Sequence, residues 1–442
     1  LGLQGRLDYM QRDGSAIIEM KSGKADEYAI RGKVSPKENH RVQMLLYQAV
    51  LQYSLGCKHQ DVTAYLFYTR YPLLYPARSS WAMVRRAINL RNRIVADEYQ
   101  IQHHNSIDFT CEKLAEIDPY ILNEKGLKGH FWQQYLCPVI SGVQQQILDL
   151  PEIESNYFYA LFKFIACEQY TSKSGDAEYE GRTGSSSLWL STFAEKITTG
   201  EILYNLRIIE NHAGDTHKAH IILSREETLN TPEELSPGLP NFREGDAVIL
   251  YQRNSVKDNA TNRMVIKGNI ESLSDSRICM RLRASQHNPG ILPAESFYAI
   301  EHDSMDTSFR SMYAGLAAFL SANTHRRQLL LGQREPDFDP VYDKAIEQAT
   351  DDFQRIALKA FAAKDYLLLI GPPGTGKTSR ALKLMVETFY HRPDTQILLL
   401  AYTNRAVDEI CKALSSIDPA IDFIRVGSEL PCDPKYRPYL LE

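Results

Sequence analysis

The chain has 442 residues, of which 43% are hydrophobic, and a formal net charge of −5. This length predicts about three domains, and the composition excludes a disordered chain. The charge excludes a global basic field, so a nucleic acid would have to be bound by local patches. No apolar run approaches the ~18 residues of a membrane span, and no basic-then-apolar leader begins the chain. We therefore expect a cytoplasmic protein without a membrane partner, associated with the nucleoid if it is bacterial.

The N-terminal segment predicts a β-hairpin. Two strand-like runs, Leu3–Met10 and Ala16–Lys21, flank Asp13-Gly14, the favoured centre of a two-residue type I′ turn. Counting outward from this turn places Asp8 directly opposite Glu19. Two opposed carboxylates repel unless a cation lies between them, which is a physical argument for a divalent-metal site. A solvent-exposed hairpin edge with incidental charges is the competing interpretation, and the spacing alone leaves both open.

Lys21 lies on the same face of the predicted strand as Glu19, because side chains alternate along a strand. Mg²⁺ or Mn²⁺ held by Asp8 and Glu19 would polarise a phosphodiester and lower the pKa of a bound water. Lys21 would orient that water or neutralise the developing charge. We expect the opposite face of the hairpin to enter a core, with the side chains of Tyr9, Ile18 and Met20.

An amphipathic helix is predicted from Asn39 to Tyr53. Gln43 and Tyr47, four residues apart, stack at one edge of its apolar stripe, where they would meet a DNA phosphate or support the metal site. Such a pair by itself is more often a feature of helix packing. The stripe that we expect to be buried comprises Val42, Leu45, Leu46, Ala49, Val50 and Tyr53.

In this order, Gly5-Arg-Leu-Asp8, Glu19-x-Lys21 and Gln43-x-x-x-Tyr47 resemble the PD-(D/E)xK nucleases of the RecB kind. The resemblance implies that Asp8 and Glu19 are metal ligands and that Lys21 is the catalytic lysine. It also implies that Gln43 and Tyr47 belong to the catalytic site.

Cysteine usage departs from that family. Many of its members hold an iron–sulfur cluster with one cysteine upstream and a tight trio downstream. The seven cysteines of this chain are scattered, with no such trio and no C-x-x-C pair, which also argues against a zinc ribbon or disulfides. We predict no iron–sulfur cluster, and the difference leaves open whether the nuclease is active. The family's upstream helix and histidine would precede Leu1.

The middle of the chain predicts further helices and strands. Val62–Arg70 completes the sheet of the first domain, and Trp81–Gln100 is a helix whose arginines fit either a solvated face or phosphate binding. A helical connector follows. Short alternating strands after Pro237 predict a small β-barrel, in which Arg281 and Arg283 share a face that is either solvated or touches nucleic acid.

The most specific motif is Gly371-x-x-x-x-Gly376-Lys377-Thr378, which follows an apolar run, Leu367–Ile370, that predicts a buried strand. In this P-loop pattern, glycines let backbone N–H groups close around phosphates, Lys377 reaches the terminal phosphates and Thr378 ligates Mg²⁺. The motif therefore predicts binding of ATP with Mg²⁺. The predicted nucleotide-binding residues are Gln354, Gly371, Gly374, Thr375, Gly376, Lys377, Thr378 and Ser379.

Two further features resemble superfamily 1 helicases. Gln354 lies upstream of the P-loop, where that superfamily has a glutamine that reads adenine. Thr403-Asn404 resembles the motif that contacts single-stranded nucleic-acid phosphates, although both residue types are also ordinary helix caps. The barrel and the run Ala401-Tyr-Thr-Asn-x-Ala-Val-Asp408 resemble the branch of the superfamily that moves 5′ to 3′.

Nearly the whole chain resembles the nuclease-helicase family that trims 5′ flaps and resects broken DNA ends. The expected fold is α/β and multidomain: a partial PD-(D/E)xK core at 1–100, a helical connector at 101–235, a small β-barrel at 236–300, a helical stalk at 301–345 and the first half of a RecA-like P-loop domain at 346–442. No strand with a metal-binding carboxylate follows Val426, so we expect part of a longer protein that binds ATP without hydrolysing it.

The expected function is metal-dependent cleavage of single-stranded or flapped DNA, coupled to an ATP-driven translocase in replication and repair. The alternative is an ATP-dependent DNA or RNA helicase whose nuclease-like domain is a vestigial nucleic-acid-binding module. The sequence does not separate DNA from RNA as the partner, and it favours a monomer.

Overall fold

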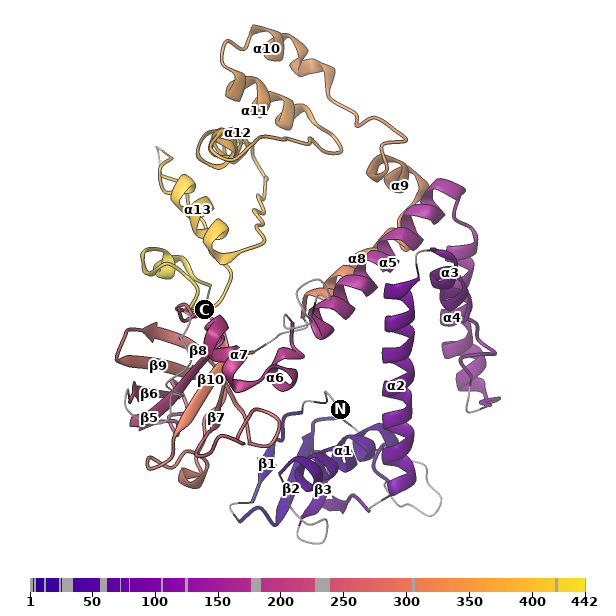
Figure 1. The fold of residues 1–442 in the computed structure, drawn as a ribbon. Helices are drawn as coiled ribbons and strands as arrows, with labels where there is room; N and C mark the ends of the chain where they lie inside the picture. Colours follow the sequence, from indigo (N-terminus) through magenta and orange to yellow (C-terminus); the bar gives the residue numbers. More distant parts are fainter. Residues whose placement is uncertain are drawn as a thin grey trace. The chain divides into compact units, whose positions relative to one another are not determined.

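The computed structural model describes the chain except for residues 1–2, 4, 12, 24, 26–34, 56–61, 72, 79, 105, 124–125, 176–183, 227–238, 304–306, 418–419 and 442. The chain forms two compact units, Leu1–Leu320 and Ser321–Glu442 (Figure 1). Among the described residues, no helix is long and apolar enough to cross a membrane.

The first unit begins with a four-stranded sheet in the order β1-β2-β3-β4. Strand β2 pairs antiparallel with β1 and parallel with β3, and helix α1 lies between β2 and β3 in the chain. This arrangement is a β-α-β crossover, which places the helix against one face of the sheet. The elements are β1 (Tyr9–Met10), β2 (Ala16–Lys21), α1 (Glu38–Ser54), β3 (Thr63–Tyr68) and β4 (Leu74–Pro76).

Helix α1 has nearly the predicted extent, and Leu45 of the predicted stripe is buried, but the buried face as a whole differs from that stripe. Val50 is 37% exposed and Tyr53 is 65% exposed, whereas Met44 and Leu51 belong to the core. The difference arises because the helix is rotated toward residues 44, 48 and 51, whose spacing of four and three defines one face. Gln48 can lie on this buried face because its amide donates to the Val62 carbonyl at 3.0 Å.

Helices follow the sheet. The long helices α2 and α5 pack against each other, and Lys173 of α5 forms an ion pair with Glu98 of α2 at 3.2 Å. The shorter helices lie between and after them. Their bounds are α2 (Trp81–His103), α3 (Asp108–Ala115), a π-helical turn (Trp132–Leu136) that runs into α4 (Cys137–Leu148), α5 (Glu152–Ser174), α6 (Ser187–Leu190) and α7 (Phe193–Thr199).

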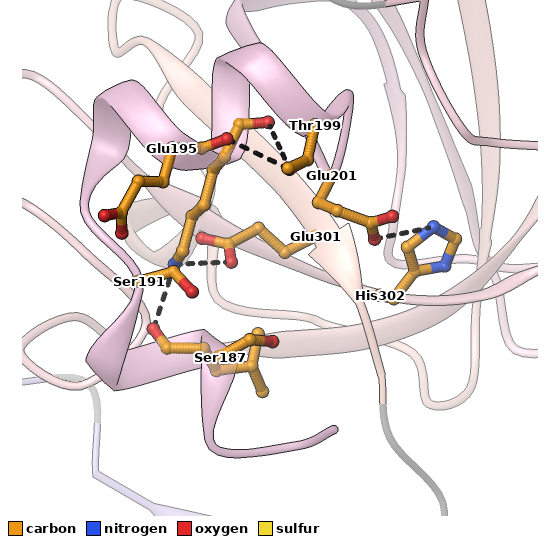
Figure 2. Close-up of a pocket in the computed structure, with 9 residues that line it drawn as sticks. Ser187, Ser191, Glu195, Thr199, Glu201, Glu301 and His302 are labelled. Carbon is orange, nitrogen blue, oxygen red and sulfur yellow. Dashed lines mark hydrogen bonds and ion pairs between the residues drawn. The ribbon is translucent and has the colours of Figure 1, made fainter. Parts of the chain in front are cut away.

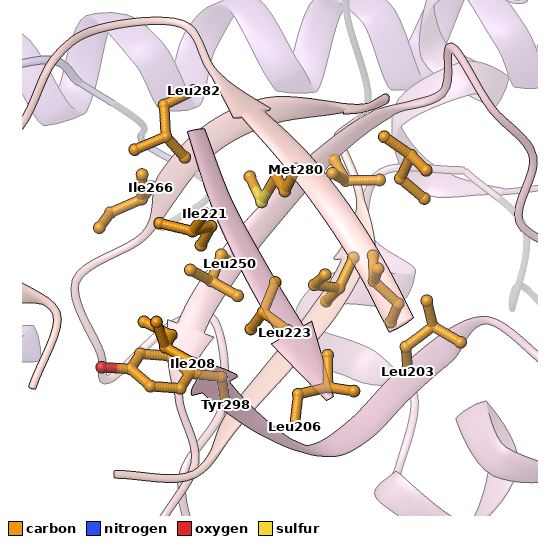
Figure 3. Close-up of a cluster of buried hydrophobic side chains, with 14 of the residues drawn as sticks. Leu203, Leu206, Ile208, Ile221, Leu223, Leu250, Ile266, Met280, Leu282 and Tyr298 are labelled. Atoms are coloured by element: carbon orange, nitrogen blue, oxygen red, sulfur yellow. The ribbon is translucent and has the colours of Figure 1, made fainter. Parts of the chain in front are cut away.

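A closed six-stranded barrel completes this part of the chain, with the strand order β10-β5-β6-β9-β8-β7. Apolar side chains from all six strands fill its interior (Figure 3). The strands are β5 (Ile202–His212), β6 (His220–Arg225), β7 (Ala247–Gln252), β8 (Ile266–Leu273), β9 (Arg277–Leu282) and β10 (Tyr298–His302).

The predicted small barrel is confirmed, but it starts earlier than residue 236. Strands β5 and β6 were expected to belong to the helical connector. They close the barrel because β5 pairs with β10 and β6 pairs with β9. Without these two strands the sheet would keep two open edges with unpaired backbone groups.

Arg283 of the barrel has an internal partner. Arg283 and Lys267 both bind the buried carboxylate of Asp303, at 3.1 Å and 2.9 Å. These pairs favour a structural role for Arg283 over a contact with nucleic acid.

Helix α8 (Thr307–Ser321) leads into the second unit, which consists of short helices joined by extended segments. Two small hydrophobic clusters hold α12 and α13 in place. The helices are α9 (Thr324–Leu330), α10 (Asp343–Gln348), α11 (Asp352–Ala362), a π-helical turn (Lys377–Leu382) that continues as α12 (Lys383–Tyr390), and α13 (Asn404–Leu414), with 3₁₀ turns at Pro340–Tyr342 and Pro434–Tyr439.

Two buried strands are absent from the described residues of this unit: the one predicted at Leu367–Ile370, and the one that the apolar run from Gln396 to Leu400 predicts ahead of Thr403-Asn404. Leu368 and Ile370 are 74% and 84% exposed, and Leu398 and Leu400 are each 80% exposed. These segments form no ladder with each other. An apolar segment cannot be buried as a strand unless neighbouring strands take up its backbone hydrogen bonds, so the RecA-like sheet remains a prediction.

Candidate metal centre and phosphate-binding loop

The N-terminal hairpin has the predicted register. Tyr9 pairs with Ile18 and Met10 with Ile17, and one further step in the same register places Asp8 opposite Glu19. In an antiparallel pair, moving one residue back on one strand moves one residue forward on the other, so this placement follows directly from the two observed pairs.

The turn of the hairpin differs from the predicted type I′ turn. Gly14, and not Asp13, has a positive φ of 74°. The Gly14 N–H donates to the Gln11 carbonyl at 2.8 Å, and the Gln11 N–H donates to the Ala16 carbonyl at 2.8 Å. Asp13 instead accepts hydrogen bonds from the backbone N–H and hydroxyl of Ser15, which lower the pKa of its carboxyl group. A longer loop with one left-handed glycine therefore gives the same register.

The carboxylates point to the face of the hairpin that α1 covers. Glu19 is 4% exposed and its neighbour on that face, Ile17, is fully buried. The expectation that Tyr9 and Met20 enter a core is wrong, because they are 55% and 53% exposed. Alternation fixes which residues share a face, but the packing of the helix decides which face is buried.

The two oxygens of the Glu19 carboxylate have different environments. Oε1 accepts hydrogen bonds from Lys21 Nζ at 2.8 Å and from Gln43 Nε2 at 2.9 Å. Oε2 is buried and has no hydrogen-bond partner within the described part of the chain. A buried charged oxygen without a partner is costly, so this atom is the natural ligand of a cation.

Gln43 and Tyr47 of α1 extend this network. Gln43 Oε1 accepts from Lys21 Nζ at 3.0 Å, and Gln43 Nε2 donates to the Tyr47 hydroxyl at 2.8 Å. Rotation of the amide by half a turn would direct its oxygen at Glu19 and its nitrogen at Lys21, which is repulsive in both contacts. The structure therefore brings together Glu19, Lys21, Gln43 and Tyr47.

Asp8 lies at the rim of this cluster, where its Oδ2 accepts from the Met20 backbone N–H at 2.9 Å. No cluster of three or more His, Cys, Asp or Glu side chains suited to a metal occurs among the described residues. Mg²⁺ is commonly bound by one or two carboxylates together with waters and substrate phosphate oxygens. Asp8 and the free oxygen of Glu19 fit that mode of binding.

The P-loop residues form a tight turn at the start of a helix. Gly374 and Gly376 have φ values of 81° and 86°, a conformation in which side chains are strained. A Cβ at Gly371 would lie 2.8 Å from Thr375 Oγ1. Lys377 Nζ donates to the carbonyls of Gly371 and Pro372 in the loop itself.

The other predicted nucleotide residues surround this turn. Thr378 is half-buried and Ser379 is exposed on the π-helical turn. Gln354 is exposed in the first turn of α11, next to Phe353. The Phe353 ring lies beside the loop, since a Cβ at Gly376 would approach it to 3.3 Å. The structure therefore places Gln354 near the P-loop.

Thr403 and Asn404 occupy the N-terminus of α13. The Thr403 hydroxyl accepts from the Ala406 N–H at 3.2 Å and so caps the helix, and Asn404 is the exposed first residue of the helix. The sequence did not predict the role of Arg425. This buried arginine follows α13 in the chain and pairs with Asp408 of α13 at 2.9 Å. The sequence signal for this pair is a basic residue within the short apolar run Phe423–Val426.

A second polar cluster lies in a small pocket between α6, α7 and β10 (Figure 2). Lys196 Nζ pairs with Glu301 at 2.7 Å and donates to the Leu188 carbonyl at 3.0 Å. The Tyr251 hydroxyl donates to the other oxygen of Glu301 at 2.5 Å, and burial together with this carboxylate raises the pKa of Tyr251. All of these polar groups are paired, so the cluster fastens α7 to the barrel.

The chain is similar to known proteins both in its C-terminal segment and over nearly its whole length. Residues 349–441, which include the P-loop and α13, match the family described as AAA domain. Over nearly its whole length the chain is homologous to proteins that are named as helicase/nucleases.

The relatives include the human and chicken proteins named "DNA replication ATP-dependent helicase/nuclease DNA2". Each is 22% identical to this chain; the match covers 96% of this chain and 41% of the human protein, and 100% of this chain and 45% of the chicken protein. The Arabidopsis thaliana helicase/nuclease JHS1 is 27% identical over 57% of this chain and 20% of its own length. The chain thus spans less than half the length of these relatives.

Proposed function

We propose that the chain carries a divalent-metal-dependent nuclease that cleaves single-stranded or flapped DNA, joined to an ATP-binding segment of a DNA translocase. The observation that carries the nuclease is the unpartnered, buried Oε2 of Glu19 in a cluster that otherwise satisfies its polar atoms. The names of the relatives, helicase/nucleases of DNA replication, support the combination of the two activities.

The residues of the hairpin have separate roles in this proposal. Asp8 and Glu19 hold Mg²⁺ or Mn²⁺, which when bound supplies Lewis-acid polarisation of the phosphodiester and acidifies a water. Lys21 is held by Glu19 and Gln43, at 2.8 and 3.0 Å, and neutralises charge that develops on the phosphate. Gln43 and Tyr47 keep the carboxylate and the ammonium group in these positions.

The second activity rests on the P-loop. Lys377 and Thr378 would bind the terminal phosphates and Mg²⁺, and Gln354 would contact the base. Thr403 and Asn404 would face a DNA backbone at the N-terminus of α13, where a helix favours phosphate. ATP binding in this segment would couple nucleotide state to movement along the DNA.

Cleavage of a flapped DNA duplex by the chain with Mn²⁺ tests the nuclease. We expect cleavage that EDTA abolishes and that Glu19→Gln and Asp8→Asn each lower at least a hundredfold. Asp13→Asn in the turn of the same hairpin is the matched control and should cleave like the unaltered chain. Undiminished cutting by both site variants would overturn the catalytic assignment.

Two further measurements separate the alternatives. Retained DNA binding without Mn²⁺ binding by calorimetry would indicate a vestigial, nucleic-acid-binding domain. Competition between DNA and RNA strands of the same sequence would decide which nucleic acid is preferred.

A further inference from the structure

Gly5, in the segment before β1, lies close to the ring of Tyr47. A Cβ built on Gly5 would lie 2.2 Å from Tyr47 Cε1, 3.0 Å from Cδ1 and 3.2 Å from Cζ. The φ of Gly5 is outside the left-handed region, so its backbone conformation is open to any residue. A glycine is therefore needed here for space: with any side chain, the Tyr47 ring or the backbone at residue 5 would have to shift.

The position of that ring controls the hydrogen bonds of Gln43. The Tyr47 hydroxyl accepts one of the two Nε2 hydrogens of Gln43, at 2.8 Å. The other hydrogen goes to Glu19 Oε1 at 2.9 Å, and Gln43 Oε1 accepts from Lys21 at 3.0 Å. A displaced ring would leave one amide hydrogen without its acceptor and allow the amide to turn away from both charged groups.

We propose that Gly5 is a positioning residue for cleavage: its missing side chain admits the Tyr47 ring, and the ring holds Gln43 against Glu19 and Lys21. This inference rests on the proposed nuclease function of the site. The three atoms nearest a Cβ built on Gly5 all belong to Tyr47, so in this proposal Gly5 acts through that ring. The metal-binding oxygen Glu19 Oε2 is not part of this chain of contacts.

A double-mutant cycle on the whole chain tests the proposal. Gly5→Ala and Tyr47→Ala should each lower kcat by about 10- to 100-fold, the range seen when groups that orient a metal ligand are lost. The double variant should be no slower than Tyr47→Ala, because the ring with which the new methyl group collides is gone. KM for DNA and the affinity for Mn²⁺ should change little. Gly23→Ala is the control, since a Cβ at Gly23 meets nothing within 4 Å.

A second readout does not depend on cleavage. The side-chain amide resonances of Gln43, assigned through a Gln43→Glu variant, should shift in Gly5→Ala and in Tyr47→Phe but not in Gly23→Ala. If Gly5→Ala does not fold, Tyr47→Ala and the double variant give the same comparison. An unchanged Gln43 resonance in Gly5→Ala would overturn the inference. So would a double variant whose loss of kcat equals the product of the losses in Gly5→Ala and Tyr47→Ala. Absence of Mn²⁺-dependent cleavage in the unaltered chain would instead contradict the proposed function.

Discussion

Lys21 Nζ lies 2.8 Å from Glu19 Oε1, so the ammonium group occupies one oxygen of the carboxylate while the other, buried, has no partner among the described residues. The pair is not a closed ion pair of the kind that only stabilises a fold. It leaves one oxygen bonded to Lys21 and the other without a partner among the described residues, which suits the proposed cation-binding site.

This difference between the two oxygens predicts a characteristic dependence of stability on metal. In EDTA, Glu19→Gln removes both a buried carboxylate oxygen without a described partner and the ion pair with Lys21, and because these two effects oppose each other its melting temperature should differ little from that of the unaltered chain. Mn²⁺ at a hundred times its dissociation constant should stabilise the unaltered chain by about 2.7 kcal/mol and leave Glu19→Gln unchanged. Differential scanning calorimetry with and without Mn²⁺ measures both effects. Equal shifts in the two proteins would place the cation elsewhere.

The buried pair of Lys196 and Glu301 predicts a large effect on barrel stability. Lys196→Met leaves Glu301, whose side chain is 3% exposed, with an unpaired charge, and should cost about 3–5 kcal/mol of unfolding free energy. Adding Glu301→Gln should recover most of this loss, because a neutral amide can still accept from Tyr251.

Denaturant unfolding curves, from which the free energy of unfolding is obtained, measure these changes. Arg277→Ala provides the comparison, because its ion pair with Glu210 is exposed and such pairs contribute at most about 1 kcal/mol. A loss in Lys196→Met no larger than in Arg277→Ala would show that Glu301 has found another partner.

Cys279 should resist alkylation in the folded chain. Burial and the neighbouring Glu271 carboxylate, to which the thiol donates at 3.5 Å, raise the pKa of Cys279 to about 11. The thiolate is the reactive form, so a pKa about two units above the ordinary value lowers its fraction roughly a hundredfold at pH 8. Iodoacetamide labelling with peptide mass spectrometry should find Cys279 protected in buffer and reactive in urea. Equal labelling in both conditions would contradict the burial of this thiol.

Lys377 should be required for nucleotide binding. Its ammonium group now donates to the loop carbonyls of Gly371 and Pro372, and phosphate oxygens would replace these acceptors. We expect Lys377→Ala to weaken binding of a fluorescent ATP analogue at least about tenfold. Lys383→Ala is the matched control, because Lys383 bonds the Ser416 carbonyl away from the loop. Similar losses in both variants would indicate general unfolding of this unit.

Local rules predicted the hairpin register and the partners on α1 but not the turn or the buried face. The pairing of Asp8 with Glu19 needed only antiparallel counting, which several turns satisfy. The choice of turn depended on the Asp13 side chain, which bonds Ser15. The burial of Glu19 depended on where α1 packs, which no residue of the hairpin encodes alone.

The sequence by itself determined the motifs, their order and the chemistry that their residues support, because phosphate loops and opposed carboxylates need particular side chains at particular spacings. Only the tertiary structure decided which oxygen of Glu19 bonds Lys21, which side chain lies against Gly5, and where the barrel closes. The physical reason is distance along the chain. Register and periodicity act between near neighbours, whereas a hydrogen bond from Gln43 to Glu19 or the pairing of β5 with β10 exists only after remote segments have packed together.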